Sequence, residues 1–96
     1  MSIRTMIVDD EPLAIERLQM LCAREPRIAL VGTASDGEAA LRLIEGLKPD
    51  LVMLDIAMPL LDGIGVARAV GRMGMRPAVI FVTAFEGFAA EAFDLA

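Results

Sequence analysis

The chain has 96 residues, which is enough for one domain and no more, so we take residues 1–96 as that domain. Its composition, 56% hydrophobic and 24% charged, indicates a folded protein rather than a disordered one. The formal net charge of -5 argues against a surface that binds nucleic acid or an anionic membrane. The absence of histidine excludes every metal site or catalytic triad that depends on that residue.

The cellular location can also be anticipated from the sequence. Cys22 is the only cysteine, which fits a reducing compartment. The first apolar run, residues 6–8, ends at once in three acidic residues, so no signal peptide is expected. No apolar stretch approaches the ~18 residues that a membrane-spanning helix needs. We therefore expect a cytoplasmic protein without a membrane segment.

The first half of the chain predicts two strand–helix units. Residues 4–8 form a short apolar run that ends in acidic residues, and a helix is predicted over residues 13–24. Four apolar residues of this helix fall on one face: Ala14, Leu18, Leu21 and Cys22. A second strand is predicted at residues 28–34. A second helix then runs over residues 37–46, with Ser35 and Asp36 as its N-terminal cap.

The second half repeats this pattern. It is predicted to contain two strands, at residues 51–54 and 78–82, and two helices, at residues 64–73 and 86–95. The first of these strands is apolar on both faces, as expected for a central parallel strand, and it ends at Asp55. Asp62 and Gly63 indicate a turn and a helix cap. The second strand ends at Thr83.

The alternation of strands and helices predicts an α/β fold with a doubly wound parallel sheet and right-handed crossovers. If the strand order is 2-1-3-4, the first, third and fourth strands are neighbours. Ligands of such sheets bind at the carboxyl ends of the strands, near the point where the strand order reverses.

Polar residues gather at this predicted edge. Asp9 and Asp10 follow the first strand, Asp55 follows the third and Thr83 the fourth. Like charges ~4.5 Å apart repel by roughly 3–4 kcal/mol at an effective dielectric of 20, so either one carboxyl pKa rises or a cation binds. Carboxylate and carbonyl oxygens suit Mg²⁺, and a carboxylate beside such a metal can act as a nucleophile toward phosphorus.

Three segments, VDDEP at residues 8–12, DLVMLDIAMPLLDG at residues 50–63 and PAVIFVTA at residues 77–84, resemble the receiver domains of bacterial two-component response regulators. The resemblance covers the whole chain in order and spacing. It implies a CheY-like, flavodoxin-like fold in which Asp55 is the phosphoacceptor and Thr83 the switch hydroxyl. It further implies that Asp9, Asp10, Asp55 and the backbone carbonyl of Ala57 bind Mg²⁺.

The same resemblance implies a regulatory domain rather than an enzyme, with a sensor histidine kinase as partner. The ending TAFEGFAAEAFDLA looks like receivers that precede LytTR-type DNA-binding domains. Transcription regulation would then act through an effector domain that this segment does not contain, and the segment itself would not contact nucleic acid.

The chain departs from the family pattern at its C-terminal end. It ends near the fourth helix, without the usual fifth strand, fifth helix and lysine at the end of strand five. The only lysine, Lys48, is expected at the opposite edge of the sheet, roughly 13 Å or more from the acidic residues. We therefore expect Mg²⁺ binding to be retained and phosphorylation to be weakened. The apolar fourth strand is also expected to self-associate, as a homodimer or an oligomer that exchanges elements.

Three other functions remain open at this stage. A receiver-like domain could mediate protein–protein interaction or dimerisation without phosphorylation. Phosphatases or phosphotransferases with an aspartate nucleophile form a third class. They have a second aspartate two residues after the nucleophile, whereas Asp9 and Asp10 are adjacent in this chain. A flavodoxin needs a phosphate-binding loop rich in small polar residues after strand one, and the carboxylates found there would repel phosphate.

Overall fold

The computed structural model describes residues 2–82, which form four strands and three helices in strict alternation. The strands are β1 (Ile3–Val8), β2 (Ile28–Ala34), β3 (Leu51–Leu54) and β4 (Ala78–Phe81). The helices are α1 (Pro12–Ala23), α2 (Gly37–Leu47) and α3 (Gly63–Arg72). The helix predicted over residues 86–95 lies outside the described residues.

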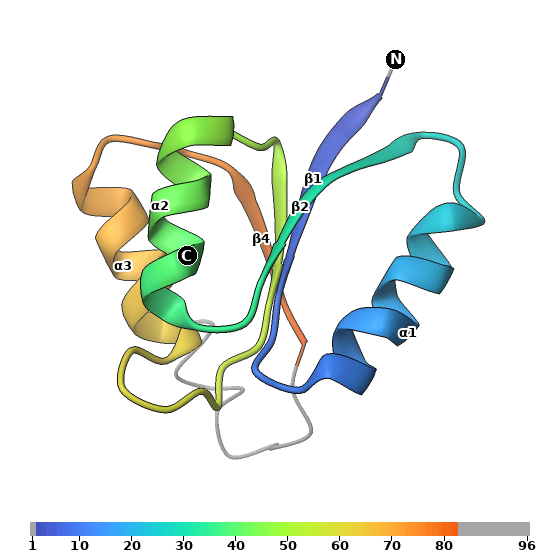
Figure 1. Cartoon of the computed structure of the whole chain (residues 1–96). Coiled ribbons are helices and arrows are strands. Elements are labelled where there is room, and N and C mark those ends of the chain that lie inside the picture. The colour runs from blue at the N-terminus through green and yellow to red at the C-terminus, as the bar shows by residue number, and fades with distance from the viewer. Residues whose placement is uncertain (1, 83–96) are drawn as a thin grey trace.

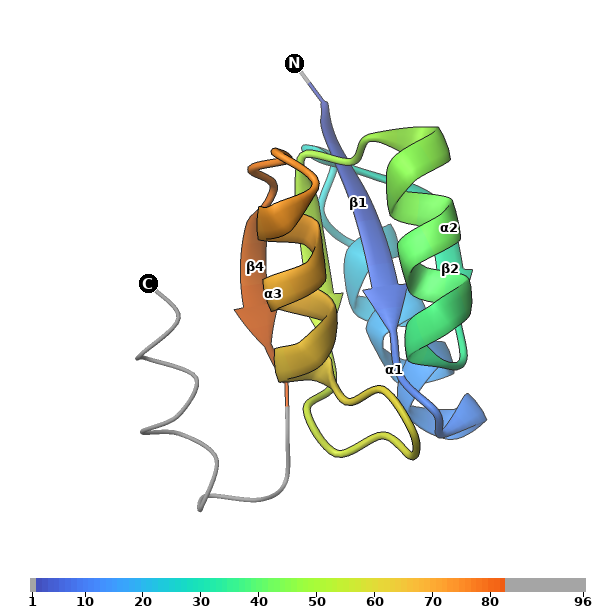
Figure 2. The same cartoon turned by 90° about the vertical axis from the view of Figure 1, so that its left-hand side faces the viewer.

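The four strands form one parallel sheet in the order β2-β1-β3-β4. Helix α1 covers one face of this sheet, and α2 and α3 lie together on the other (Figures 1 and 2). The predicted doubly wound fold and its strand order are therefore confirmed. Every strand points the same way, so the four carboxyl ends share one edge, which the first βα connection and the loop after β3 also occupy.

Strand β1 lies in the middle of the sheet and is its most buried element. Met6, Ile7 and Val8 are almost completely inaccessible to solvent, because β1 has a strand on each side and helices on both faces. The register of β1 against β2 shifts by one residue after Thr5, since Thr5 pairs with Leu30 and Met6 with Gly32. The extra residue makes a bulge in the edge strand β2.

The main core lies between the sheet and the α2–α3 layer. Ile44 of α2 and Val66 and Val70 of α3 pack with the buried β3 residues Val52 and Leu54. Both helices begin at an aspartate whose side chain accepts a backbone hydrogen bond, from Ala39 to Asp36 and from Gly65 to Asp62. These are the positions at which the sequence predicted helix caps.

Helix α1 packs on its side of the sheet over β1 and β2, and its buried residue is Cys22. The predicted apolar face of this helix is only partly correct, because Leu21 is exposed. Leu21 precedes Cys22 by one residue and is therefore rotated by about 100° from the line along which the helix touches the sheet. No helix among the residues described is both long enough and apolar enough to cross a membrane.

Candidate functional site

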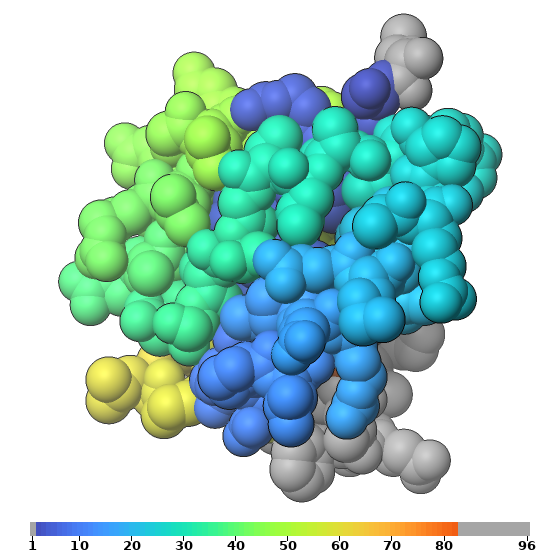
Figure 3. Space-filling model, turned by 45° about the vertical axis from the view of Figure 1, so that its right-hand side comes forward, coloured from blue at the N-terminus to red at the C-terminus, as the bar shows by residue number. Residues whose placement is uncertain are grey.

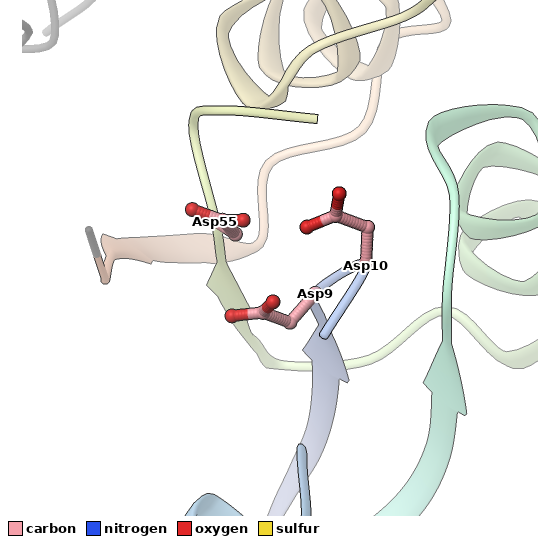
Figure 4. A group of neighbouring side chains, drawn as sticks. All are labelled: Asp9, Asp10 and Asp55. Carbon is pink, nitrogen blue, oxygen red and sulfur yellow. The ribbon is translucent and has the colours of Figure 1, made fainter. Parts of the chain in front are cut away.

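Three aspartates lie together at the carboxyl edge of the sheet. Asp9 and Asp10 directly follow the central strand β1, and Asp55 directly follows its neighbour β3. The backbone N–H of Asp55 donates to the carbonyl of Val8 at 2.9 Å, so the parallel pairing of the two strands continues to the base of the site. Residues 46 positions apart in the sequence are thereby fixed side by side, with their carboxylates facing one another (Figure 4).

The three carboxylates are close enough to share one cation. One carboxylate oxygen from each of Asp9, Asp10 and Asp55 lies within 4.8 Å of the other two. Two oxygens bound on opposite sides of one Mg²⁺ lie about 4.2 Å apart, twice a metal–oxygen bond of ~2.1 Å. The donor atoms are all hard oxygens, which this cation prefers to nitrogen or sulfur. The residues present therefore fit a divalent cation of that kind.

Asp9 is buried, and its carboxylate is held in place by the chain itself. The backbone N–H of Asp9 donates to Ala34 of β2, and its side chain accepts the N–H of Glu11 at 2.9 Å. The second bond orients the carboxylate at the entry to α1. Glu11 is exposed and is not part of the carboxylate group.

The environment shifts the acid–base equilibrium of Asp55. The pKa of Asp55 is raised from 3.8 to about 6, mainly by partial burial, then by the neighbouring charge of Asp9 and less by Asp10. A hydrogen bond from the Ala57 backbone N–H to Asp55 Oδ1, 3.3 Å long, acts in the opposite direction. Asp55 is therefore ionised above about pH 6, in a cluster where its charge is unfavourable until a cation compensates it.

The loop after β3 is folded tightly against Asp55. A Cβ atom added to Gly63 would lie 2.1 Å from the Asp55 carbonyl oxygen, which is far inside van der Waals contact. The backbone N–H of Gly63 also donates to Ile56 at 2.9 Å. Glycine is therefore required here so that the start of α3 can touch the backbone of Asp55. The sequence pointed to this residue only as part of a turn, and its contact with Asp55 was not foreseen.

The structure thus brings together Asp9, Asp10 and Asp55, with Ala57 two residues after Asp55. Thr83 lies outside the described residues. Lys48 ends α2 with left-handed backbone geometry and precedes β3, so it lies at the amino edge of the sheet, as the sequence predicted.

The sequence profile of the response regulator receiver domain matches residues 5–95. The chain belongs to that family. A curated relative, the positive alginate biosynthesis regulatory protein of Pseudomonas aeruginosa, is 53% identical over 94% of this chain and 37% of its own length. Other curated relatives include the transcriptional regulatory protein BtsR of Salmonella typhi, at 38% identity over 96% of this chain. This receiver domain spans little more than a third of the length of these relatives.

Solved receiver domains have the same fold. The signal receiver domain of the response regulator NarL from Mycobacterium tuberculosis superposes with a TM-score of 0.92 at 32% identity, covering 99% of this chain and 78% of that one. A CheX–CheY–BeF3–Mg complex from Borrelia burgdorferi superposes with a TM-score of 0.88 at 26% identity, covering 98% of this chain and 72% of that one. Neither the profile nor these relatives name a LytTR domain, so that association stays a prediction.

Proposed function

We propose that this receiver domain accepts a phosphoryl group on Asp55 in a Mg²⁺-dependent reaction. The observation that carries the proposal is the meeting of three carboxylates at the carboxyl edge of the sheet, where one of them, Asp55, has a raised pKa. Asp9 and Asp10 are proposed to hold the cation together with Asp55 and the backbone carbonyl of Ala57. Thr83 is proposed as the switch hydroxyl on the resemblance of the sequence alone.

The orientation of Asp55 supports its role as nucleophile. The Ala57 N–H engages Oδ1 of Asp55, which leaves Oδ2 free of that bond. In the proposed step a carboxylate oxygen of Asp55 attacks phosphorus and forms a P–O bond. The bond from phosphorus to the donor breaks, and its electron pair leaves with the donor as acetate or as imidazole, so the product is an acyl phosphate.

Charge is the main obstacle to this step. Three carboxylates repel the anionic phosphoryl group, and the charges of Asp9 and Asp10 add to burial in raising the pKa of Asp55. Mg²⁺, when bound, supplies positive charge that compensates both the carboxylates and the group in transfer. The contribution of the chain is to hold Asp9 and Asp10 beside Asp55 on two adjacent strands, so that little reorganisation is needed.

The similar CheY complex supports the same assignment. That complex contains both Mg²⁺ and BeF3. When BeF3 binds a carboxylate oxygen it is tetrahedral and anionic, as the phosphoryl group of an acyl phosphate is. We carry the pairing of cation and phosphoryl group over to the carboxylate group of this chain as a proposal.

The test is phosphorylation by a small donor. The protein is incubated with Mg²⁺ and acetyl phosphate and its intact mass is measured. We expect a mass increase of one phosphoryl group, which EDTA and Asp55→Asn both abolish. Asp50→Asn is the matched control, because Asp50 is an exposed aspartate at the opposite edge of the sheet and should leave the adduct unchanged. If the wild-type chain gives no adduct at any Mg²⁺ concentration, the proposal fails and an interaction module that acts without phosphorylation becomes the better reading.

The wider context follows from the family. Receiver domains work with histidine kinases, and several curated relatives are named as transcriptional regulatory proteins. We propose a sensor histidine kinase as the phosphodonor, a cytoplasmic location, and control of transcription through an effector domain that binds DNA. The LytTR class of that effector rests on the resemblance of residues 83–96 alone.

A second proposal concerns self-association through β4. Within the described residues β4 pairs only with β3, and Ile80 is 49% exposed on the sheet face that bears α1. An open apolar strand is a template for pairing with another chain. Sedimentation equilibrium should show a dimer or larger species at tens of micromolar, and a monodisperse monomer would contradict the proposal.

A further inference from the structure

Leu60 combines two unfavourable features at one position. Its side chain is fully exposed, with more accessible surface than any other large apolar residue described. Its backbone has φ of 68°, in the left-handed region that a residue with a Cβ atom seldom adopts. Glycine or asparagine would adopt this conformation more easily and would expose less apolar surface. The fold itself therefore gives no reason for a leucine.

The exposure of Leu60 does not come from a loose loop. The next residue, Leu61, packs against the backbone of two helices, because Cβ atoms added to Gly37 or Gly65 would collide with it. Asp62 then caps α3, and Gly63 contacts the backbone of Asp55. Leu60 is thus held in a fixed position by the residues that follow it, while its own side chain stays fully exposed.

The loop that carries Leu60 borders the carboxylate group. It begins at Asp55 and returns to the same place, since the N–H groups of both Met58 and Gly63 donate to the carbonyl of Ile56. In Figure 3 the yellow part of the chain, which contains this loop, stands out at the edge of the molecule beside the blue segment that leads from β1 into α1. A protein that presents a phosphoryl group to Asp55 must approach over this edge.

We propose that Leu60 is a contact residue for the protein that donates the phosphoryl group, inserting into an apolar pocket beside the donor residue. The inference rests on the proposed function of Asp55 and deepens it by assigning a partner contact. Burying a leucine against the partner removes apolar surface from water, which favours binding without touching the reacting atoms. Leu60 therefore selects the protein donor and has no role with a small one.

The test compares two phosphodonors on the same variants. One is acetyl phosphate. The other is the autophosphorylated cytoplasmic domain of a sensor histidine kinase. This kinase is chosen from a panel of purified kinases as the one that transfers its phosphoryl group fastest to the wild-type chain. Leu60→Ala removes the apolar contact, and Leu60→Gly also releases the backbone strain. Met73→Ala is the control, because Met73 is an exposed apolar residue after α3 at the opposite edge of the sheet.

We expect both Leu60 variants to lose about tenfold in kcat/KM with the kinase, from the loss of one buried leucine, and to be unchanged with acetyl phosphate. Leu60→Gly should also unfold at a higher urea concentration than wild type, which separates a binding role from a structural one. Met73→Ala should behave as wild type with both donors.

Other outcomes would contradict either this inference or the proposed function, and the two cases can be told apart. Unchanged transfer from the kinase in both Leu60 variants would overturn the inference. An equal loss with both donors would also overturn it, because Leu60 would then act on the site itself. A wild-type chain that accepts the phosphoryl group from acetyl phosphate but from no kinase would exclude a kinase as the partner. A wild-type chain that takes none from acetyl phosphate would refute the proposed function instead.

Discussion

Replacing Asp55 by asparagine is predicted to stabilise the metal-free protein near neutral pH. The pKa of Asp55 is raised from 3.8 to about 6, first by partial burial and then by the charge of Asp9. The folded state therefore holds the Asp55 proton more tightly than the unfolded state does. The stabilisation of the folded state by protonated Asp55 is fully present below about pH 4 and is lost as the pH rises through about 6. At neutral pH the ionised carboxylate is thus a net cost to folding.

The size of this cost follows from the same shift. A rise of about two pKa units corresponds to about 3 kcal/mol at 1.36 kcal/mol per unit. Because water still reaches part of the Asp55 side chain and screens its charge, we expect about 1–2 kcal/mol. Asparagine has the same shape without the charge. Asp55→Asn should therefore raise the free energy of unfolding by about 1–2 kcal/mol near pH 7.5, and by about half as much near pH 5.

The assay is urea unfolding in EDTA, followed by circular dichroism because the chain has no tryptophan or tyrosine. The urea midpoint should rise by about 1 M near pH 7.5 for a protein of this size. Asp62→Asn is the matched control, because Asp62 is exposed and asparagine also caps helices well, so its midpoint should stay close to that of wild type. Added Mg²⁺ should then stabilise wild type more than Asp55→Asn. If Asp55→Asn is no more stable than wild type near pH 7.5, or gains equally at both pH values, the electrostatic reasoning is wrong.

Three further predictions concern the framework around the site. Gly63→Ala should lower the free energy of unfolding by more than about 2 kcal/mol and reduce labelling of Asp55 by acetyl phosphate, because its Cβ would collide with the Asp55 carbonyl. A Cβ atom added to Gly71 of α3 would meet only open space, so Gly71→Ala should instead raise the free energy of unfolding by about 0.5–1 kcal/mol. Equal effects of the two alanine substitutions would contradict the contact between Gly63 and the Asp55 carbonyl. Asp36→Ala should lower the free energy of unfolding by about 1 kcal/mol, because α2 loses its N-terminal cap. Asparagine also caps helices, so an Asp36→Asn variant that is equally destabilised would rule out capping as the cause. Ile44→Ala should cost about 2–5 kcal/mol and Ile44→Val about 1 kcal/mol, measured by the same urea unfolding, and a smaller loss for alanine than for valine would mean that Ile44 is not in the core.

Much of the fold follows from the sequence because its signals are local. Strands β2 and β3 have the predicted bounds; β1, α2 and β4 differ from theirs by one residue at one end, and α1 and α3 are each shifted by one residue at both ends. Apolar runs that end in aspartate predict both a buried strand and a polar residue at its carboxyl end. The strand order 2-1-3-4 then brings Asp9, Asp10 and Asp55 together, as the structure shows.

The features that were missed depend on contacts between distant segments. The approach of Gly63 to the Asp55 carbonyl requires the loop to fold back, and nothing in the letters DG distinguishes that contact from an ordinary turn. The exposure of Leu21 depends on how narrowly α1 touches the sheet, which periodicity alone does not specify. The left-handed backbone of Leu60 contradicts the usual preference of leucine, so no propensity rule predicts it.

The central place of β1 has a consequence for synthesis on the ribosome. Its most apolar residues, Met6, Ile7 and Val8, leave the ribosome before either strand that will flank them. Strand β2 begins about 20 residues later and β3 about 43 residues later, so at ~5–20 residues per second the second flank is missing for roughly 2–9 s. During that time the nascent chain exposes an apolar stretch that is fully buried in the finished sheet, where a chaperone that binds extended apolar segments would find its target.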